Sequence, residues 1–430
     1  MENGSLDPRL RRIEQANMKG KVVLLRVDHN VVKKGIIKDP YRIEPTFPTL
    51  YVIAERGVRP ILMTHIGRPM DKKTGKIRCR EEESIGPVVE YLSRRLSIRI
   101  NVPDFPIDPK KGILHLDGSM GAALEDLRKG RTGMIYLPNC RWFQGEQSDG
   151  PEREAFSKEL ADLADLYVND AFGSYRAHAS TYDVAGRLPS FAGPLLQKEI
   201  INLDKVLDPE RPFVAVVAGA KYDTKIGPLK ALYHKADHLI LGGLMYNTFL
   251  SAKYGVRMEG VSEEDRELAR ELVEMDRKEN KIVEMPYLVE SDTMEGKVEG
   301  HVRSIDVHDF KEGMAFKHVL DIDPKSFEER AVKDVLLSAR TVFVNAVMGF
   351  MPHFFEGSQA LYDLVASNRS SIKLFGGGDT LQELKNLCPG KYLAGLDAAD
   401  TYYFTGGGSV LAAIEKGSPY GLSPVEALMD

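Results

Sequence analysis

Residues 213–221 read Phe213-Val-Ala-Val-Val-Ala-Gly-Ala-Lys221, an apolar run that ends in small residues and a lysine. A short apolar run that ends in turn residues is typical of a strand buried on both faces. Small residues after such a strand let backbone amides approach a phosphate, and the start of a following helix favours anions. Lys225 lies one helical turn beyond Lys221. The stretch predicts a parallel strand that leads into an anion site, although two nearby lysines also occur on ordinary solvated faces.

The same pattern, an apolar run followed by polar residues or glycine, recurs along the chain. Segments with helical spacing separate the runs, for example Glu264 to Lys278, so the alternation favours parallel βαβ units over an antiparallel sandwich. We therefore predict an α/β fold whose polar loops lie at the carboxyl ends of the strands, where doubly wound sheets bind ligands. The predicted strands are Val22–Val27, Ile61–Met63, Met134–Leu137, Leu166–Val168, Phe213–Val217, Leu239–Leu241, Val342–Val344, Ile372–Phe375 and Tyr402–Phe404.

Length and composition limit what these strands can build. With 430 residues, 43% of them hydrophobic, the chain is long enough for two or three domains with sizeable cores. The net charge of −5 provides no global basic field that would recruit nucleic acid or anionic lipid. Cys79, Cys140 and Cys388 form no Cys-x-x-Cys pair, and neither an export signal nor a run of eighteen apolar residues is visible. We therefore expect a cytoplasmic protein that binds neither nucleic acid nor membrane.

The chemistry of the loops changes along the chain. Arg, His, Asp and Asn dominate the loops before about residue 180, whereas Gly and Lys dominate those after 215, which two domains facing one cleft would explain. Residues 194–207 have helical spacing and are stopped by Asp208-Pro209-Glu210-Arg211-Pro212. We predict an N-terminal domain over residues 1–193, a connecting hinge helix over 194–211, a C-terminal domain over 212–410 and a C-terminal segment over 411–430.

The first half places arginines beside or just beyond the predicted strands. A guanidinium fork matches the oxygens of phosphate and carboxylate groups, although a single loop arginine is usually only solvated. Asp28 and Asn30 commonly occur in turns, but beside the arginines they are suited to accept hydrogen bonds from the hydroxyls of a polyol. The basic candidates are Arg26, Arg42, Arg68, Arg141 and Arg176, accompanied by His65 and His178.

The second half contains two glycine triplets, Gly376-Gly377-Gly378-Asp379-Thr380 and Thr405-Gly406-Gly407-Gly408-Ser409. Each follows a predicted strand and precedes a predicted helix, which favours a nucleotide cradle, although a tight turn alone also explains a triplet. Neither triplet matches the P-loop pattern or G-x-G-x-x-G. The motifs of zincins, serine hydrolases and protein kinases are absent as well.

Taken in order, these motifs resemble the motif series of the phosphoglycerate kinase family over roughly residues 20 to 425. A single motif is weakly specific, but so many in one order are highly specific. The motifs that carry the resemblance are Arg26-Val27-Asp28-His29-Asn30, Tyr41-Arg42-Ile43, Thr64-His65-Ile66-Gly67-Arg68-Pro69, Asn169-Asp170-Ala171-Phe172-Gly173, Arg176-Ala177-His178, Gly219-Ala220-Lys221 with Lys225-Ile226-Gly227, Gly376-Gly377-Gly378-Asp379 and Thr405-Gly406-Gly407-Gly408.

The resemblance implies two Rossmann-like, doubly wound domains joined by a hinge, with the C-terminal segment returning to the first domain. It implies reversible phosphoryl transfer between ATP and the carboxylate of 3-phosphoglycerate, with ATP or ADP as co-substrate and Mg²⁺ as cofactor, in a monomer or homodimer. The residues matched to phosphoglycerate binding are Asp28, Asn30, Arg42, His65, Arg68, Arg141 and Arg176.

The resemblance also assigns the nucleotide half of the reaction. Arg42 and Lys221 would flank the transferred phosphoryl group as catalytic residues, and Asp379 would hold Mg²⁺ through the nucleotide. The residues matched to nucleotide binding are Gly219, Ala220, Lys221, Lys225, Gly242, Gly243, Asn345, Gly376, Gly377, Gly378, Asp379 and Thr380.

The chain departs from the family pattern where the nucleoside is expected. Pro352 stands where the family has a ribose-binding glutamate, Glu356 is close but out of register, and Asp323 replaces a glycine of the nucleoside pocket. Ala346 also replaces a glycine. Two alternatives therefore stay open: a paralogue with another phosphoryl donor or another small phosphorylated acid, and a non-catalytic metabolite-binding protein. The latter would lack the charged reaction-centre residues that this chain keeps.

Overall fold

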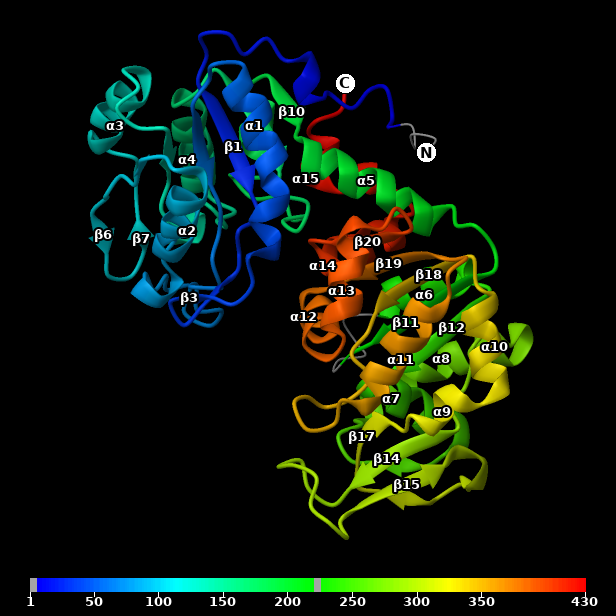
Figure 1. Ribbon diagram of the computed structural model, residues 1–430. Coiled ribbons are helices and arrows are strands. Elements are labelled where there is room, and N and C mark those ends of the chain that lie inside the picture. The colour runs from blue at the N-terminus through cyan, green and yellow to red at the C-terminus, as the bar shows by residue number, and fades with distance from the viewer. Residues whose placement is uncertain (1–5, 220–225) are drawn as a thin grey trace. The chain divides into compact units, whose positions relative to one another are not determined.

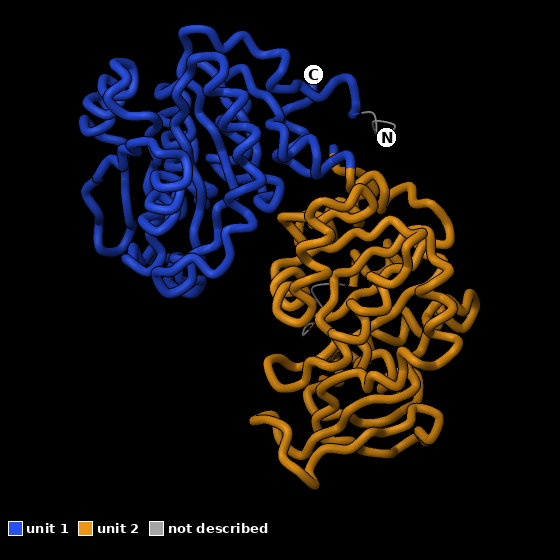
Figure 2. The backbone as a smooth tube through the Cα atoms, viewed as in Figure 1, with its two compact units in different colours: residues 1–201, 420–430 blue, residues 202–419 orange. Residues whose placement is uncertain are grey.

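The computed structural model describes residues 6–219 and 226–430 (Figure 1). The chain divides into two compact units (Figure 2): unit 1 comprises Met1–Ile201 and Tyr420–Asp430, and unit 2 comprises Asn202–Pro419. In the described part of the chain, no helix combines the length and apolarity that crossing a membrane requires. The predicted domain boundaries after residues 193, 211 and 410 stay predictions.

Unit 1 is built on a six-stranded parallel sheet in the order β10-β9-β1-β4-β8-β5. The strands are β1 (Val23–Val27), β4 (Pro60–Met63), β5 (Ile100–Asn101), β8 (Met134–Tyr136), β9 (Leu166–Asp170) and β10 (Ser190–Ala192). The helices are α1 (Phe47–Glu55), α2 (Gly86–Leu96), α3 (Ser119–Arg128), α4 (Pro151–Asp162) and α15 (Ser423–Glu426). Short strands form two hairpins, β2 (Val32–Lys33) with β3 (Ile36–Ile37) and β6 (Ile107–Asp108) with β7 (Gly112–Ile113).

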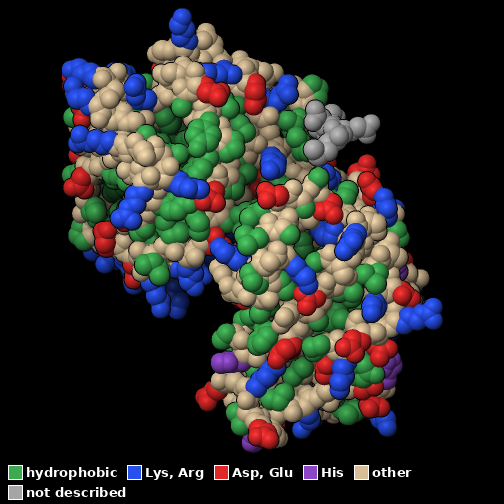
Figure 3. Space-filling model, viewed as in Figure 1, with side chains coloured by type: hydrophobic (Ala, Val, Ile, Leu, Met, Phe, Trp, Pro, Cys, Tyr) green, Lys and Arg blue, Asp and Glu red, His purple; other side chains and the backbone are tan. Residues whose placement is uncertain are grey.

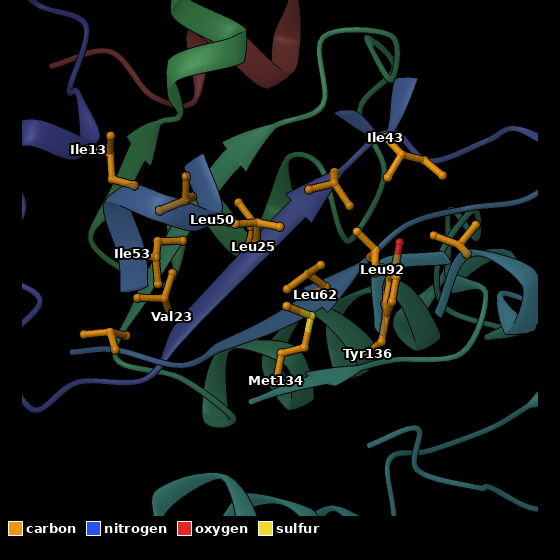
Figure 4. Close-up of a cluster of buried hydrophobic side chains, with 14 of the residues drawn as sticks. Ile13, Val23, Leu25, Ile43, Leu50, Ile53, Leu62, Leu92, Met134 and Tyr136 are labelled. Carbon is orange, nitrogen blue, oxygen red and sulfur yellow. The ribbon is translucent and has the colours of Figure 1, made fainter. Parts of the chain in front are cut away.

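The central strand β1 is buried on both faces of this sheet. Val23 and Leu25 belong to one apolar cluster with Leu50 of α1 and Leu92 of α2 (Figure 4). Successive side chains of a strand alternate between the two faces, and Leu24, which points the other way, is also fully buried. Burial on both faces is why the parallel strands have continuous apolar sequences rather than alternating ones.

Unit 2 repeats the arrangement with a five-stranded parallel sheet in the order β12-β11-β18-β19-β20. Its strands are β11 (Phe213–Ala218), β12 (His238–Gly242), β18 (Thr341–Asn345), β19 (Ile372–Gly376) and β20 (Thr401–Phe404). Its helices are α6 (Ile226–Lys235), α7 (Gly243–Tyr254), α8 (Glu263–Glu279), α9 (Lys325–Glu328), α10 (Arg330–Ser338), α11 (Glu356–Ser367), α12 (Gly378–Leu387), α13 (Pro389–Asp397) and α14 (Gly407–Lys416). Two parallel sheets alternating with helices confirm the predicted α/β fold.

A smaller antiparallel sheet in unit 2 was not predicted. Its order is β15-β14-β17, from β14 (Tyr287–Ser291), β15 (Val302–Asp306) and β17 (His318–Ile322). β14 and β17 mix buried with half-buried positions and β15 has no buried position, so these strands lack the continuous apolar runs by which nine parallel strands were found. A further short parallel pair joins β13 (Arg257–Met258) and β16 (Ala315–Phe316).

The helix predicted after residue 193 is α5 (Pro194–Leu207). The start of α5 is tied to the end of β9, because Oδ1 of Asp170 accepts the N–H of Leu196 at 3.0 Å. Gly193 makes the approach possible, since a Cβ there would lie 2.3 Å from that oxygen. Burial raises the pKa of Asp170 to about 7.

Candidate active site

The carboxyl ends of four neighbouring strands carry the predicted site residues of unit 1. The order β9-β1-β4-β8 within the sheet brings the loops after these strands to one edge. Arg42 lies nearby in the 3-10 helix Pro40–Arg42. The other residues follow their strands: Asp28 and Asn30 after β1, His65 and Arg68 after β4, Arg141 after β8, and Arg176 with His178 after β9.

Asp28 and Arg141 each carry a buried polar atom that is left without a protein partner. Oδ2 of Asp28 lies 3.6 Å from Nη1 of Arg42, whereas Oδ1 of Asp28 has no hydrogen-bond partner among the described residues. Nη1 of Arg141 donates to the carbonyl of Gly67 at 2.5 Å, and within the same described ranges its buried Nε is unpartnered. Burial lowers the pKa of Arg141. An unused acceptor and an unused donor in one cluster indicate room for a ligand that offers both.

His65 connects β1 to this cluster. Its Nδ1 lies 3.0 Å from Nη2 of Arg26, and its Nε2 lies 3.2 Å from Nδ2 of Asn30. Oδ1 of Asn30 accepts the N–H of Gly67 at 2.9 Å. Burial, together with the charges of neighbouring arginines, holds the pKa of His65 well below its usual value. The imidazole is therefore neutral at pH 7.

Arg68 and Arg176 are exposed at the rim of the cluster. The charge of Arg68 adds to the lowering of the Arg141 pKa, after the larger effect of burial. Burial and the surrounding arginines, Arg176 among them, lower the pKa of His178 to about 4. An environment that opposes further positive charge favours an anion, and guanidinium groups bind the oxygens of phosphates and carboxylates.

The buried groups that contact Arg26 behind His65 were not predicted from the sequence. Arg26, only 1% exposed, donates from Nε to Oγ of Ser180 at 3.0 Å, and that hydroxyl donates to Oε1 of Glu146 at 2.7 Å. Arg26 was predicted only as one of several arginines near strand ends. Ser180 follows it by 154 residues, and no motif marks either Ser180 or Glu146.

The candidate residues of unit 2 lie at the carboxyl ends of its parallel strands. Ala220, Lys221 and Lys225 lie outside the described residues, so their predicted roles stay predictions. The described candidates are Gly219 after β11, Gly242 and Gly243 at the junction of β12 and α7, Asn345 at the end of β18, and Gly376, Gly377, Gly378, Asp379 and Thr380 at the junction of β19 and α12.

The two glycine triplets meet backbone to backbone. Nδ2 of Asn345 donates to the carbonyl of Gly376 at 2.7 Å. Gly377 has a φ of 108°, which is strained for any residue with a Cβ. A Cβ on Gly407 would lie 2.4 Å from Cα of Gly377. Only glycine fits this contact, which draws the loops after β18, β19 and β20 together.

Helices α12 and α14 both begin at this contact. Their N-cap residues, Gly377 and Gly406, supply no side-chain hydrogen bond, so the first amides of each helix are left for another acceptor. Asp379 is exposed and Thr380 is buried in the first turn of α12. In the described part of the chain, no group of three or more His, Cys, Asp or Glu could hold a metal by itself. One carboxylate beside a phosphate cradle nevertheless suits Mg²⁺, which is commonly bound by few carboxylates together with substrate phosphates.

A second pair of loops meets beside the first. The N–H of Met245 donates to the carbonyl of Gly219 at 3.2 Å. Gly243 has a φ of 58°, and a Cβ on it would lie 3.4 Å from the same carbonyl oxygen. A Cβ on Gly242 would lie 2.6 Å from Sδ of Met348. The glycines thus let the start of α7 approach the end of β11.

Asp323, which departs from the family pattern, and Glu356, the carboxylate near the expected ribose position, both have protein partners. Oδ1 of Asp323 accepts the N–H of Lys325, the first residue of α9, at 3.0 Å. Glu356 forms an ion pair with Lys297, and each of these side chains is 37% exposed. Lys297 Nζ also lies 5.5 Å from the ring centroid of Phe354. Pro352 lies in the loop between β18 and α11 and offers no carboxylate.

Comparisons with known proteins give the same result from sequence and from structure. The family model described as phosphoglycerate kinase matches residues 13–417. A phosphoglycerate kinase of Dictyoglomus turgidum is 34% identical over 411 residues, and one of Rubrobacter xylanophilus is 36% identical over 412 residues. Each alignment covers 94% of this chain and 95% of the relative. The structure of phosphoglycerate kinase from Coxiella burnetii matches with a TM-score of 0.72 at 27% identity, covering 98% of this chain and 99% of that chain.

Proposed function

The chain belongs to the phosphoglycerate kinase family, and on that premise we propose how its residues carry out reversible phosphoryl transfer between ATP and the carboxylate of 3-phosphoglycerate. The basic cluster of unit 1 binds the phosphorylated acid, and the glycine loops of unit 2 bind the nucleotide. The observation that carries this assignment is the pair of unpartnered buried atoms, Oδ1 of Asp28 and Nε of Arg141, inside an arginine-rich cluster.

Each group of unit 1 has a chemical task in this proposal. Arg68, Arg141 and Arg176 bind the oxygens of the substrate phosphate, because a guanidinium matches them in charge and geometry. Asp28 and Asn30 hold the hydroxyl and carboxylate end of the acid, for which the free oxygen of Asp28 supplies an acceptor. His65 is neutral and contributes a hydrogen bond rather than a charge.

In unit 2 the backbone supplies most of the binding. Amides at the starts of α12 and α14 bind phosphate oxygens, and Asn345 fixes the loop that leads into α12. Gly219, Gly242 and Gly243 line the adjoining turn. Lys221 and Lys225, outside the described residues, keep their predicted roles on the phosphates. Asp379 would hold Mg²⁺, which supplies charge neutralisation at the nucleotide when bound.

The chemistry needs no general base in the chain. The attacking carboxylate of 3-phosphoglycerate is already ionised at neutral pH, so no proton has to be removed. What the chain must supply is neutralisation of charge on the transferred phosphoryl group and positioning of the attacking oxygen. Arg42 and Lys221 provide the charge. The rest of the basic cluster provides the positioning.

One specific observation favours a second candidate function, the same fold with another phosphoryl donor. Pro352 removes a carboxylate from the expected ribose position, and Glu356 is engaged by Lys297. The groups that would recognise a nucleoside are therefore altered, whereas the groups that would bind phosphates are kept. Under this alternative, unit 1 works as described and only the donor differs.

We propose a monomeric or homodimeric enzyme that works in the cytoplasm on small molecules, without nucleic-acid or membrane partners. Supporting the reducing compartment, Cys79, Cys140 and Cys388 are all free thiols. Burial raises the pKa of the Cys140 thiol to about 12, so it has little tendency to react as a thiolate. The net charge of −5 is consistent with the absence of polyanionic partners.

A coupled assay with purified protein tests the proposal. 3-Phosphoglycerate is offered with ATP, GTP, ADP or pyrophosphate, and Arg42→Ala serves as the matched control against contaminating host enzyme. We expect turnover with ATP that the substitution lowers by roughly 10²–10³. Turnover with GTP or pyrophosphate but not ATP supports the second candidate. Failure with every donor contradicts both, because each requires the same acid.

A further inference from the structure

Buried hydrogen bonds link Arg26, Ser180 and Glu146 behind His65, and the donor and acceptor of each bond can be assigned. A guanidinium donates and never accepts, so Oγ of Ser180 accepts from Nε of Arg26 at 3.0 Å. The same hydroxyl donates to Oε1 of Glu146 at 2.7 Å, and the N–H of Ser180 donates to Oε2 at 3.0 Å. Both oxygens of Glu146 are thereby occupied. The only consistent direction runs from Arg26 through Ser180 to Glu146.

These hydrogen bonds join two opposite charges that do not touch. Arg26 and Glu146 are each 1% exposed, and Ser180 is fully buried. Among the described residues, no carboxylate lies within ion-pair distance of Arg26. Burial raises the pKa of Glu146, and the positive charge of Arg26 opposes that rise. A charge pair bridged by one hydroxyl in a buried site is sensitive to the loss of any member, because the remaining charge is left uncompensated.

The other end of Arg26 determines which nitrogen of His65 carries the proton. Nη2 of Arg26 lies 3.0 Å from Nδ1 of His65. Oγ of Ser174 lies farther from the same Nδ1, at 3.5 Å. Arg26 and the Nδ2 of Asn30 can both only donate, and one nitrogen of a neutral imidazole accepts. We assign the acceptor to Nδ1, because the charged guanidinium at 3.0 Å is a closer and stronger donor than the neutral amide at 3.2 Å from Nε2. A neutral imidazole has one N–H, which therefore belongs to Nε2.

The protonated nitrogen faces a second donor. Nε2 of His65 lies 3.2 Å from Nδ2 of Asn30, whose Oδ1 is already occupied by the N–H of Gly67. Neither group offers the other an acceptor. An oxygen atom placed beside both would accept from both, and the oxygens of a phosphorylated carboxylic acid are of that kind.

We propose that Ser180 and Glu146, acting through Arg26, are positioning residues that hold His65 as the Nε2–H tautomer, so that it donates to an oxygen of the phosphorylated acid. The inference rests on the proposed function for the identity of that acid. The arrangement of Arg26, Ser180 and Glu146 itself stands on the contacts within unit 1. His65 thereby binds an anion without becoming a cation itself.

The first test reads the tautomer directly. Full-length protein carrying ¹⁵N-labelled histidine is studied by NMR between pH 6 and 8, and the His65 signals are assigned by their loss in His65→Gln. We expect protonated Nε2, unprotonated Nδ1, and a shift of the Nε2 signal when 3-phosphoglycerate is added. A proton on Nδ1 in the unmodified protein overturns the proposal, whatever the activity.

The second test separates positioning from general stability. Ser180→Ala removes the bridge and Ser180→Thr keeps a hydroxyl, while Glu146→Gln removes the charge at nearly constant size. Ser157→Ala is the matched control, because buried Ser157 likewise accepts from an arginine, Arg187 Nε at 2.9 Å, outside the site. We expect Ser180→Ala and Glu146→Gln to raise KM for 3-phosphoglycerate about tenfold, with kcat and KM for ATP unchanged.

The expected pattern also requires Ser180→Thr to restore KM and Ser157→Ala to leave it unchanged. Equal KM values for 3-phosphoglycerate in all four variants and the unmodified protein overturn the proposal, as does an equal rise in KM for both substrates. Absence of turnover in the unmodified protein contradicts the proposed function instead, and the NMR test of the tautomer still decides this inference.

Discussion

The candidate sites of the two units consist of different chemical groups. Unit 1 uses charged side chains, some of them buried, such as Arg26 and Asp28. Unit 2 uses backbone, brought into contact at Gly377 and Gly407, where no side chain fits. In a space-filling view, Lys, Arg, Asp and Glu are spread over the visible face (Figure 3). We therefore expect the site of unit 1 to lose function when a charge is removed, and the site of unit 2 to lose function when a side-chain atom is added.

The largest effect is expected from removing charge at the reacting group. Arg42→Ala should lower kcat by 10²–10³, since loss of one group that stabilises the transition state costs about 3–4 kcal/mol. Lys221→Ala, at a residue outside the described part of the chain, should behave alike. Steady-state kinetics measures both. Arg94→Ala, at an arginine on α2 whose side chain is 80% exposed, is the control that should change nothing. Near-normal kcat in Arg42→Ala would remove that residue from the mechanism.

Adding one methyl group at Gly407 should weaken nucleotide binding by unit 2. Gly407→Ala places a Cβ 2.4 Å from Cα of Gly377, and overpacking of this kind costs about 1–3 kcal/mol. We expect KM for the nucleotide to rise roughly 10–100-fold while the affinity for 3-phosphoglycerate is kept. In Gly390→Ala, the matched control on α13, the new Cβ meets nothing within 4 Å. Equal effects of the two substitutions would show that the contact between the triplets does not shape the site.

Removing rim charge from unit 1 should affect one substrate only. Arg68→Ala and Arg176→Ala should each raise KM for 3-phosphoglycerate about tenfold, because a hydrogen bond to a charged group contributes about 1.5–3 kcal/mol and these side chains are exposed. KM for ATP should stay constant. A parallel rise in both KM values would mean that the substrates have been assigned to the wrong units.

The smallest effect concerns the nucleoside departures. Pro352→Glu combined with Asp323→Gly should tighten ATP by about 1 kcal/mol, or roughly fivefold, because a carboxylate is returned to the expected ribose position. The gain is limited because the hydrogen bond from the N–H of Lys325 to Asp323 at the start of α9 is lost. Isothermal titration of both proteins with ATP measures it. Tight ATP binding by the unmodified chain, unchanged in the variant, would show that these positions do not limit recognition.

Much of the fold could be predicted because most of the parallel strands have continuous apolar sequences. Each of the nine predicted runs overlaps a parallel strand; the run Phe213–Val217, for example, lies in β11 (Phe213–Ala218). Burial on both faces demands continuous apolar sequence, whereas the short strands β5 and β10 were not predicted. The sheet formed by β14, β15 and β17 was not predicted, because β14 and β17 mix buried with half-buried residues and β15 has no buried residue. Periodicity finds elements whose burial is uniform, and misses those that are only partly covered.

The candidate site was predictable only as far as single residues reveal their chemistry. Arginines and glycines at strand ends pointed to anion binding, and the structure brings Asp28, Asn30, Arg42 and His65 together. The contacts of Glu146 and Ser180 with Arg26 could not be predicted, because they depend on the packing of residues far apart in the sequence.

The most direct test of the central claim, that side chains of unit 1 bind the phosphorylated acid, is an isothermal titration of Arg141→Lys with 3-phosphoglycerate in the absence of nucleotide. Lysine keeps the positive charge but lacks the Nε–H that is left unpartnered in the arginine. The account predicts that the affinity for 3-phosphoglycerate falls about tenfold while ATP binding is unchanged. An unchanged affinity for 3-phosphoglycerate would contradict it.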